Sequence, residues 1–371
     1  MKNWWSGTKA SRAGGCAALL AVVGLSLGSV ADAQELKRDE HVMLFPTTAR
    51  SLADGRTQSR VEAWVYERER RPGAATLLAL GLGLDLSDLS PVDRARYEGR
   101  TQLFRIDSEG RRELRVRFGS EAPVRLPATG ADGRVSATVV LRRGPDAGPR
   151  GVDRPQWLDY SVVPTAGDPR RFAGRVLWLP ASGLSVVSDI DDTIKRTQVR
   201  ERREMLLNTF AREFMPVPGM AAWFGRIAAA DPAASFHYVS GGPHQLYPAL
   251  AEFLLVQAFP AGTVHLRSVA IGQEIFNAGS GTRTHKLAVI GQLLQDFPQR
   301  RFVLVGDSGE QDPEIYGELV RAHPGRIVAI AIRDVSGEPA DSPRYVEAMH
   351  KVPRERWRVF TAPDNLPNGG F

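Results

Sequence analysis

After Pro180 the sequence alternates between apolar runs of strand length and longer segments with helical spacing. Helical patterns cover Gly219 to Ala230, Gln245 to Gln257 and Lys286 to Phe297. The apolar runs between them are "LSVVSD", "SFHYVS", "TVHLRSVA", "RFVLVGD" and "RIVAIAIRD". Apolar strands that alternate with helices are typical of a parallel sheet that is buried on both faces. We therefore predict an α/β domain over residues 181–352, followed by a C-terminal tail over residues 353–371.

Residues 34–180 follow a different pattern, in which apolar and other residues alternate with period two between Gly, Asp and Pro turns. This pattern predicts an antiparallel β-sandwich or sheet. We find no catalytic constellation in this part and interpret it as an accessory module. Its expected elements are strands around Val61 to Val65, Leu114 to Phe118, Val135 to Leu141, Trp157 to Val163 and Phe172 to Leu179, a helical patch at Pro91 to Tyr97, and a loop or insertion at Gly144 to Pro155.

The first 33 residues have the three parts of a secretory signal. Lys2, Lys9 and Arg12 form a basic start, an apolar stretch follows from Ala17 to Leu27, and small residues end the segment at Ala33. The alternative is a membrane anchor, but the apolar stretch is shorter than the ~20 residues that a span needs. We therefore expect export to the periplasm or the medium, with cleavage near Ala33.

Cleavage at that point would remove Cys16, which is the only cysteine, so the mature chain would have neither disulfides nor thiol chemistry. The whole chain has a formal charge of +6, and its arginines are dispersed along the sequence. A dispersed basic surface is usually solvated, although it also favours anionic lipid or phosphate partners. We expect no nucleic-acid partner.

Polar residues directly follow three of the predicted strands, namely Asp189, Ser240 and Asp307. In open α/β sheets, ligands bind at the carboxyl ends of the strands. We therefore expect these side chains to meet at one edge of the sheet and to form a site.

Three other kinds of site are excluded, because residues that they require are absent from the required positions. An EF-hand loop opening at Asp189 would need Gly and Glu where Ile194 and Arg200 stand. A nucleophile elbow at Ser240 would need Gly in place of Tyr238. The stretch "GSGTRTHK" lacks the Gly before its Lys and the Ser or Thr after it that a P-loop requires.

Phosphoryl transfer through an aspartate remains. Asp189 and Asp191 are two residues apart, so in extended backbone both side chains would leave the same face. One could attack phosphorus while the other exchanges protons with the leaving alcohol and water. A dianionic phosphate repels a carboxylate nucleophile, so we expect Mg²⁺ between them, bound by Asp189 and Asp307. Lys286, at the start of a helix, could neutralise charge, and Ser240 could donate a hydrogen bond to the phosphate.

Each residue also has a structural interpretation. Asp192 could brace the turn, Ser240 could be an ordinary loop hydroxyl, and Lys286 could be a solvated helix residue. Asp307 and Asp312 could be a helix N-cap and a first-turn acid. We do not expect all of these structural interpretations to apply at once.

The motifs resemble those of haloacid-dehalogenase-superfamily phosphatases. The pattern D-x-D-x-T is met by Asp189, Asp191 and Thr193. The remaining elements follow in the expected order, and they are Ser240, Lys286, and Gly306 with Asp307 and Asp312. The resemblance implies a Rossmann-like parallel sheet with a small cap insert.

A closer resemblance is to the actin-patch-protein-like phosphatidate phosphatases. It rests on "SDIDDTIKRTQV", "PVPGMAAWFGRI", "FHYVSGGPHQLYPAL", "THKLAVIGQLLQDFPQRRFVLVGDSGEQDPEIY" and "RIVAIAIRDV". It implies Mg²⁺-dependent hydrolysis of phosphatidate to diacylglycerol and phosphate through an aspartyl-phosphate.

By that resemblance Asp189 is the nucleophile, Asp191 is the acid/base and Lys286 completes the catalytic set. Thr193, Ser240 and Gly241 would bind the phosphate. The metal ligands would be Asp189, Asp307, Asp312 and the main-chain oxygen of Asp191. Two departures are Gly241–Gly242 after Ser240, which changes the loop's substrate contacts, and the export signal.

The segment from Lys195 to Pro216 allows two interpretations. Leu206, Leu207, Phe210 and Phe214 recur at roughly helical spacing among arginines. This face could dock on an anionic membrane, or it could pack on the core as an ordinary amphipathic helix. For the whole chain, the alternatives to a phosphatidate phosphatase are a phosphatase for lysophosphatidate or a sugar phosphate, and an inactive surface-binding module.

Overall fold

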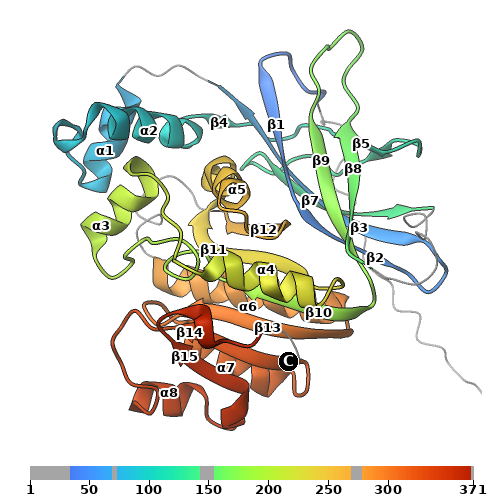
Figure 1. The fold of residues 1–371 in the computed structure, drawn as a ribbon. Coiled ribbons are helices and arrows are strands. Elements are labelled where there is room, and N and C mark those ends of the chain that lie inside the picture. The colour runs from blue at the N-terminus through green and yellow to red at the C-terminus, as the bar shows by residue number, and fades with distance from the viewer. Residues whose placement is uncertain (1–33, 69–72, 143–153, 269–277, 369–371) are drawn as a thin grey trace, which may run out of the picture.

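The computed structural model describes residues 34–68, 73–142, 154–268 and 278–368 (Figure 1). The predicted signal segment and nearly all of the loop from Gly144 to Pro155 lie outside these residues. Among the helices described, none combines the length and the apolar character needed to cross a bilayer.

The amino-terminal strands form one connected nine-stranded sheet. The long strand β3 (Thr57–Glu67) pairs antiparallel with β1 (Glu40–Phe45), β2 (Thr47–Ser51), β4 (Asp107–Ser108) and β7 (Arg134–Leu141). The sheet continues from β2 through β9 (Ala173–Leu179), β8 (Gln156–Val162) and β5 (Arg115–Phe118) to β6 (Val124–Arg125). Only the β2–β9 pair is parallel, so the predicted β-rich part with mainly antiparallel pairing is confirmed.

Two helices interrupt this sheet between β3 and β4. α1 (Ala74–Leu82) was not predicted, and α2 (Pro91–Thr101) extends the predicted patch. Ser90 caps α2 by accepting a hydrogen bond from the backbone N–H of Asp93 at 3.1 Å, and Pro91 occupies the first turn, where it is tolerated. In Figure 1 both helices lie beside the carboxy-terminal half rather than on their own sheet.

The carboxy-terminal half contains a six-stranded sheet in which every neighbouring pair is parallel, as predicted. Its order is β12 (Gly262–Arg267), β11 (Ser235–Pro243), β10 (Ser182–Ser188), β13 (Gln299–Asp307), β14 (Ile327–Arg333) and β15 (Trp357–Phe360). The last strand, β15, lies in the segment expected to be a tail and adds an edge to the sheet.

Helices cover both faces of this sheet because consecutive strand residues point to opposite sides. Val186 packs in one apolar core and Val187 in the other. The first core contains α4 (Met220–Ala230) and α5 (Tyr247–Val256), and the second contains α6 (Ala278–Asp296), α7 (Asp312–Ala322) and α8 (Pro343–Ala348). The three layers bring the carboxyl ends of the strands to one open edge.

A short helical segment crosses this edge. It consists of α3 (Arg202–Leu206), continued by η4 (Leu207–Ala211), which is a π-helical turn. α2 packs directly against η4, so the two halves of the chain meet above the strand ends.

Candidate active site

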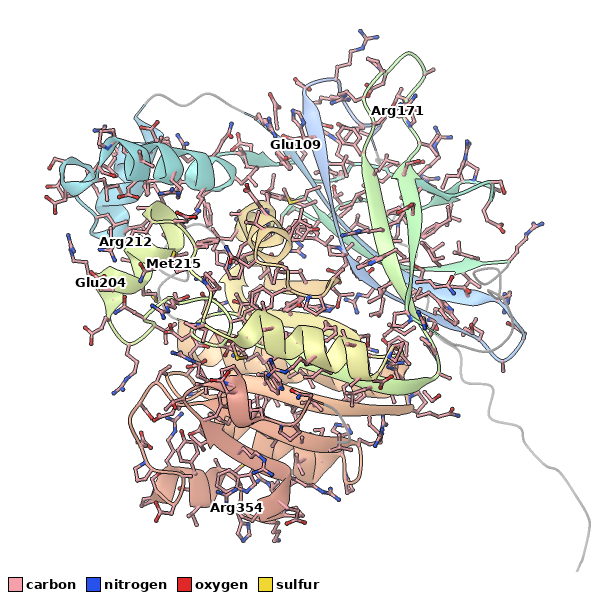
Figure 2. All side chains as sticks on the ribbon, in the orientation of Figure 1. Glu109, Arg171, Glu204, Arg212, Met215 and Arg354 are labelled. Atoms are coloured by element: carbon pink, nitrogen blue, oxygen red, sulfur yellow. The ribbon has the colours of Figure 1, made fainter. Side chains whose placement is uncertain are left out.

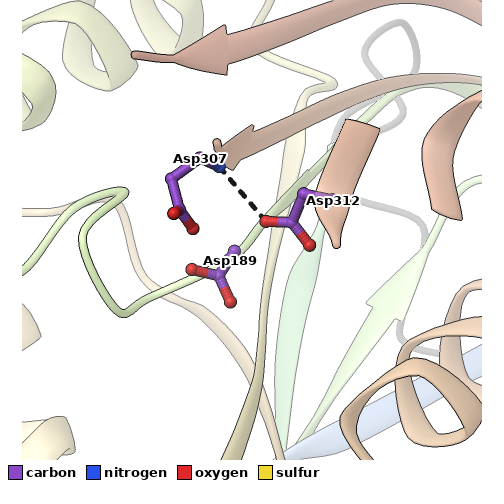
Figure 3. A group of neighbouring side chains, drawn as sticks. All are labelled: Asp189, Asp307 and Asp312. Atoms are coloured by element: carbon purple, nitrogen blue, oxygen red, sulfur yellow. Dashed lines mark hydrogen bonds between the residues drawn. The ribbon is translucent and has the colours of Figure 1, made fainter. Parts of the chain in front are cut away.

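Three buried carboxylates lie together at the carboxyl edge of the parallel sheet (Figure 3). Asp189 directly follows β10, Asp307 ends β13, and Asp312 begins α7. Each offers an oxygen that lies within 4.8 Å of oxygens of the other two. The backbone N–H of Asp307 also donates to Asp312 Oδ2 at 3.2 Å. The predicted convergence of Asp189, Asp307 and Asp312 is therefore present.

Lys286 projects into this group from α6. Its Nζ lies 2.8 Å from Asp189 Oδ1, 2.5 Å from Asp312 Oδ1 and 3.4 Å from Glu310 Oε2. The prediction that Lys286 stands at a helix start is wrong, because α6 begins at Ala278 and Lys286 lies in its interior. A position inside a packed helix fixes the lysine more firmly than a fraying end would.

The charges of the group are not balanced within the protein. Burial raises the pKa of Asp189 well above its usual range, and Asp312 and Glu310 raise it further while Lys286 opposes them. Burial likewise raises the pKa of Asp307, with Asp312 and Asp189 adding to the effect. Burial alone would lower the pKa of Lys286, but its acidic neighbours raise it well above the ordinary value. One lysine among these acids leaves an excess of negative charge that a cation would relieve.

Two oxygens in the group have no hydrogen-bond partner among the described residues, and they are Asp189 Oδ2 and Asp307 Oδ2. Buried polar atoms without partners are rare, so each needs an explanation. Two glycines keep space around these acids. A Cβ at Gly306 would collide with Asp312, and one at Gly309 would fall 2.9 Å from Asp307 Oδ1. Unpaired carboxylate oxygens facing one another suit a hard divalent cation such as Mg²⁺.

Asp189 and Asp191 lie just beyond the end of β10, and the prediction that both side chains leave the same face stays a prediction. β10 ends at Ser188, and the chain then turns, with Ile194 N and Lys195 N donating to Ile190 O at 3.0 and 2.9 Å. The turn sends the two carboxylates to different partners. Asp189 faces Lys286, whereas Asp191 Oδ1 lies 2.8 Å from Lys195 Nζ.

Asp191 sits among hydrogen-bond donors. Its Oδ1 accepts from Thr197 Oγ1 at 2.7 Å and its Oδ2 accepts from Ser240 Oγ at 2.9 Å. Burial would raise its pKa, but the charge of Lys195 and the hydrogen bonds from Lys195, Thr197 and Ser240 hold the pKa below its usual range. Its side chain is therefore not part of the carboxylate group, and metal binding through its main-chain oxygen stays a prediction.

The three predicted phosphate-binding residues surround this position. Ser240 Oγ, at the end of β11, donates to Asp191 and accepts from Gly242 N at 2.9 Å. Gly241 packs so tightly on Thr282 of α6 that a Cβ would collide with it. Thr193 is buried and its hydroxyl has no partner among the described residues. The role of Thr193 in binding phosphate stays a prediction.

Asp192 braces the turn, as its structural interpretation proposed. Its carboxylate accepts from the backbone N–H groups of Thr197, Gln198 and Val199 at 2.8, 2.8 and 2.7 Å. Its φ of 54° lies in the left-handed region, which Asp tolerates better than most residues. The third acid of the motif thus shapes the loop that carries Asp191.

Two residues of the site were missed. Lys195 is buried beside Asp191, and Glu310 is one of the acids around Lys286. The rarity of lysine that drew attention to Lys286 applies equally to Lys195, since the chain has six lysines. Glu310 has no such signal, because it stands in a loop rich in acids.

The four apolar residues singled out in the segment from Lys195 to Pro216 are buried. Leu206, Leu207, Phe210 and Phe214 all belong to the core that also contains α4 and α5. The structure therefore agrees with the amphipathic-helix interpretation, and these four side chains do not form an exposed membrane-binding face.

Comparison with known proteins bears on the carboxy-terminal half. Residues 184–334 match the family model described as phosphatidate phosphatase APP1, catalytic domain. Phosphatidate phosphatase APP1 of Saccharomyces cerevisiae is 35% identical over 175 residues, which make up 46% of this chain and 29% of that protein. An uncharacterized protein of Schizosaccharomyces pombe is 32% identical over 179 residues, which make up 46% of this chain and 28% of that protein.

These matches confirm the resemblance to APP1-like catalytic domains over the parallel sheet and its site. The chain spans less than a third of the length of the two relatives. The solved structure of a carbohydrate esterase aligns with 79% of this chain and with 88% of the esterase chain, at 12% identity. The TM-score of this alignment is 0.22, which is too low to bear on the fold.

Proposed function

Taking the match of residues 184–334 as the premise, we propose that the chain is a Mg²⁺-dependent phosphoric monoester hydrolase acting on phosphatidate or a related phospholipid. The observation that supports this most is the state of the Asp189 carboxylate. Lys286 orients one of its oxygens, while the other is buried and unpaired beside the unpaired oxygen of Asp307. Such a carboxylate is positioned to attack rather than to stabilise the fold.

In this proposal Asp189 attacks phosphorus and forms an aspartyl-phosphate, which water then hydrolyses. Lys286 holds the attacking carboxylate and offsets the negative charge of the transferring phosphoryl group. The alcohol leaves opposite Asp189, and the separate position of Asp191 suits a group that serves the leaving oxygen.

Asp191 would give a proton to that oxygen and later take one from the attacking water. Lys195 keeps Asp191 ionised in the free protein, so protonation would accompany the arrival of a dianionic phosphate, which raises the pKa of a neighbouring acid. Ser240, Thr193 and the backbone at Gly241 would then contact phosphoryl oxygens.

The residues present fit a magnesium ion. Asp307 would hold it through its unpaired oxygen and Asp189 through its carboxylate, and Asp312 would orient Lys286 and the Asp307 backbone. Mg²⁺ bound there would reduce the repulsion between a dianionic phosphate and the acidic site.

Two wider proposals accompany this one. The order of the parallel sheet and the placement of the four motifs at its carboxyl edge support a haloacid-dehalogenase-like domain. The basic, apolar and small-residue sections of residues 1–33 support export with cleavage near Ala33. Mass spectrometry of the protein recovered from its native host would show whether the mature chain starts there.

The test is a phosphate-release screen of the purified protein over lipid and soluble phosphomonoesters, with Mg²⁺ or with EDTA. The proposal predicts release that requires Mg²⁺ and includes phosphatidate. Release from soluble esters alone would contradict the lipid substrate, and release that is unchanged in EDTA would contradict the metal.

A further inference from the structure

A small cavity opens from Asp191. Its volume is about 80 Å³, and its polar end is formed by Asp191, Ser240 and Thr197. Lys195, Thr282 and Glu310 also line the cavity, and its remaining walls are mainly apolar and include Met205, Phe210, Phe214 and Leu250. The cavity therefore has polar residues at one end and mainly apolar residues along its other walls.

The position of Asp191 determines which part of a substrate would lie in this cavity. A general acid must come within hydrogen-bond reach of the oxygen that it protonates. If Asp191 serves the leaving oxygen, the carbon that bears this oxygen lies in the cavity. A sugar there would bury hydroxyl groups against apolar walls without partners, whereas an apolar chain would replace water at no such cost.

A larger groove adjoins this cavity. Its volume is about 550 Å³, it lies between α2 and α5, and it shares Phe214 and Leu246 with the cavity. Its walls include Leu103, Phe253 and Val256, while Arg96 and Arg100 face Glu213 and Glu252. Because these charges balance, the groove has no excess of positive charge to attract a phosphate. The phosphate would stay at Lys286 and the apolar part would extend into the groove.

Phe214, the residue between the two spaces, is held from both sides. The guanidinium of Arg100 lies 3.6 Å from its ring centroid, and Lys195 Nζ lies 4.9 Å from it. Arg100 also donates to the carbonyl oxygens of Thr209 and Arg212 at 3.2 and 2.6 Å. α2 thereby fixes the segment from η4 to Phe214, in which Figure 2 labels Arg212.

α2 comes from the β-rich half, outside the residues that match the phosphatase family. Its helical insertion packs closely on the other half, with Phe104 meeting Phe210 edge to face at 5.5 Å. Arg96 Nη1 also donates to Ala211 O at 3.3 Å. The part of the chain that the sequence suggested to be an accessory module thus builds a wall of the groove.

We propose that the cavity and the groove together form the binding site for the apolar part of the alcohol, and that α2 determines specificity for alcohols that carry a chain. The inference rests on the proposed function, because it needs Asp191 to serve the leaving oxygen. It assigns the β-rich half a direct part in substrate selection.

Gly99 gives a clean test, since it lines the groove from α2 and a Cβ there would meet nothing within 4 Å. Gly225 on α4 is an equally open helical glycine away from the groove, so it provides a matched control. Gly99→Trp and Gly225→Trp would be compared on monomeric dioctanoyl phosphatidate and on glycerol 3-phosphate, which share a headgroup and differ in chains.

We expect Gly99→Trp to lower the ratio of kcat/KM for the chain-bearing ester to that for glycerol 3-phosphate by roughly tenfold or more, mainly through KM. Gly225→Trp should leave the ratio unchanged. Met205→Trp, which fills the inner cavity, should lower the ratio as well, with exposed Met215→Trp as its control. A ratio unchanged in both Gly99→Trp and Met205→Trp, with folded protein by circular dichroism, would overturn the inference.

Two further outcomes separate this inference from the proposed function. If the wild-type protein hydrolyses neither ester with Mg²⁺, the proposed function fails, and binding of dioctanoyl phosphatidate measured by calorimetry then tests the groove alone. Wild-type binding that Gly99→Trp weakens would support the groove, and equal binding would overturn it. An effect of Gly99→Trp on phosphatidate in vesicles but not on the monomeric ester would also overturn it, because membrane docking and not chain recognition would then be altered.

Discussion

Lys286 Nζ lies 2.8 Å from Asp189 Oδ1, and each of these side chains is only 1% exposed. The pair is buried together with Asp312, whose Oδ1 is 2.5 Å from the same nitrogen. Buried charges are tolerated only when they are paired or coordinated. The contact between Lys286 and Asp189 therefore stabilises the site and also holds the carboxylate proposed to react.

Lys286→Met should destabilise the metal-free protein by about 3 kcal/mol or more, because it leaves Asp189 and Asp312 buried without their cation. Mg²⁺ should restore a larger part of the stability in this variant than it adds to the wild type. Thermal unfolding with and without Mg²⁺ measures both effects. A variant as stable as the wild type in EDTA would contradict the view that Lys286 neutralises these acids.

Asp307→Asn should have the opposite effect on the metal-free protein. Burial, Asp312 and Asp189 raise the pKa of Asp307, so an uncharged amide relieves repulsion and should stabilise the protein by about 1–2 kcal/mol. The same change removes a metal ligand, so the increase in Tm caused by Mg²⁺ should disappear. Asp341→Asn, at an exposed position, is the control and should retain the wild-type response. A normal Mg²⁺ response in Asp307→Asn would show that Asp307 does not bind the ion.

Asp192→Ala should cost about 3 kcal/mol of unfolding free energy, since three backbone N–H groups lose their acceptor. Asp192→Asn should cost less, because Asn also tolerates a positive φ and keeps one acceptor oxygen. Urea unfolding of the two variants gives the comparison. If Asn were as damaging as Ala, the charge of Asp192, and not its geometry, would be the important property.

Gly241→Ala should reduce kcat/KM by roughly tenfold, because the new Cβ would push the loop after Ser240 away from Thr282. Adding Thr282→Ala should recover part of the loss, since it removes two of the three atoms that the Cβ would meet. Gly225→Ala is the control on a helix with open space. Independent, additive effects of Gly241→Ala and Thr282→Ala would contradict the packing explanation.

Much of the carboxy-terminal half could be predicted from the sequence because its strands are buried on both faces. Such strands are mainly apolar, so β10 and β13 stand out as apolar runs, and Asp189 after β10 and Asp307 at the end of β13 interrupt these runs. β15 was missed because Trp357 to Phe360 is short and follows charged residues, so no apolar run identifies it.

Other features depend on tertiary contacts that no local pattern encodes. The position of Lys286 within α6 could not be read from spacing, because this helix starts in a stretch of small and polar residues from Ala278 onward. The turn after Asp189 depends on Asp192 accepting bonds from residues five to seven positions later. The contact of α2 with η4 joins residues more than a hundred positions apart, which sequence periodicity cannot detect.

The central claim is that Asp189 accepts the phosphoryl group. Its most direct test is peptide mass mapping of the Asp191→Asn variant after acid quenching of a reaction with Mg²⁺ and dioctanoyl phosphatidate. Because Asp191 would serve both steps, its loss should slow hydrolysis of the intermediate as well as its formation, so a quench after prolonged incubation should capture the phosphorylated form. We predict a phosphoryl group on the peptide that contains Asp189, and none when Asp189→Asn is added. Phosphate release by Asp189→Asn at the wild-type rate, or a phosphoryl group on another residue, would contradict the account.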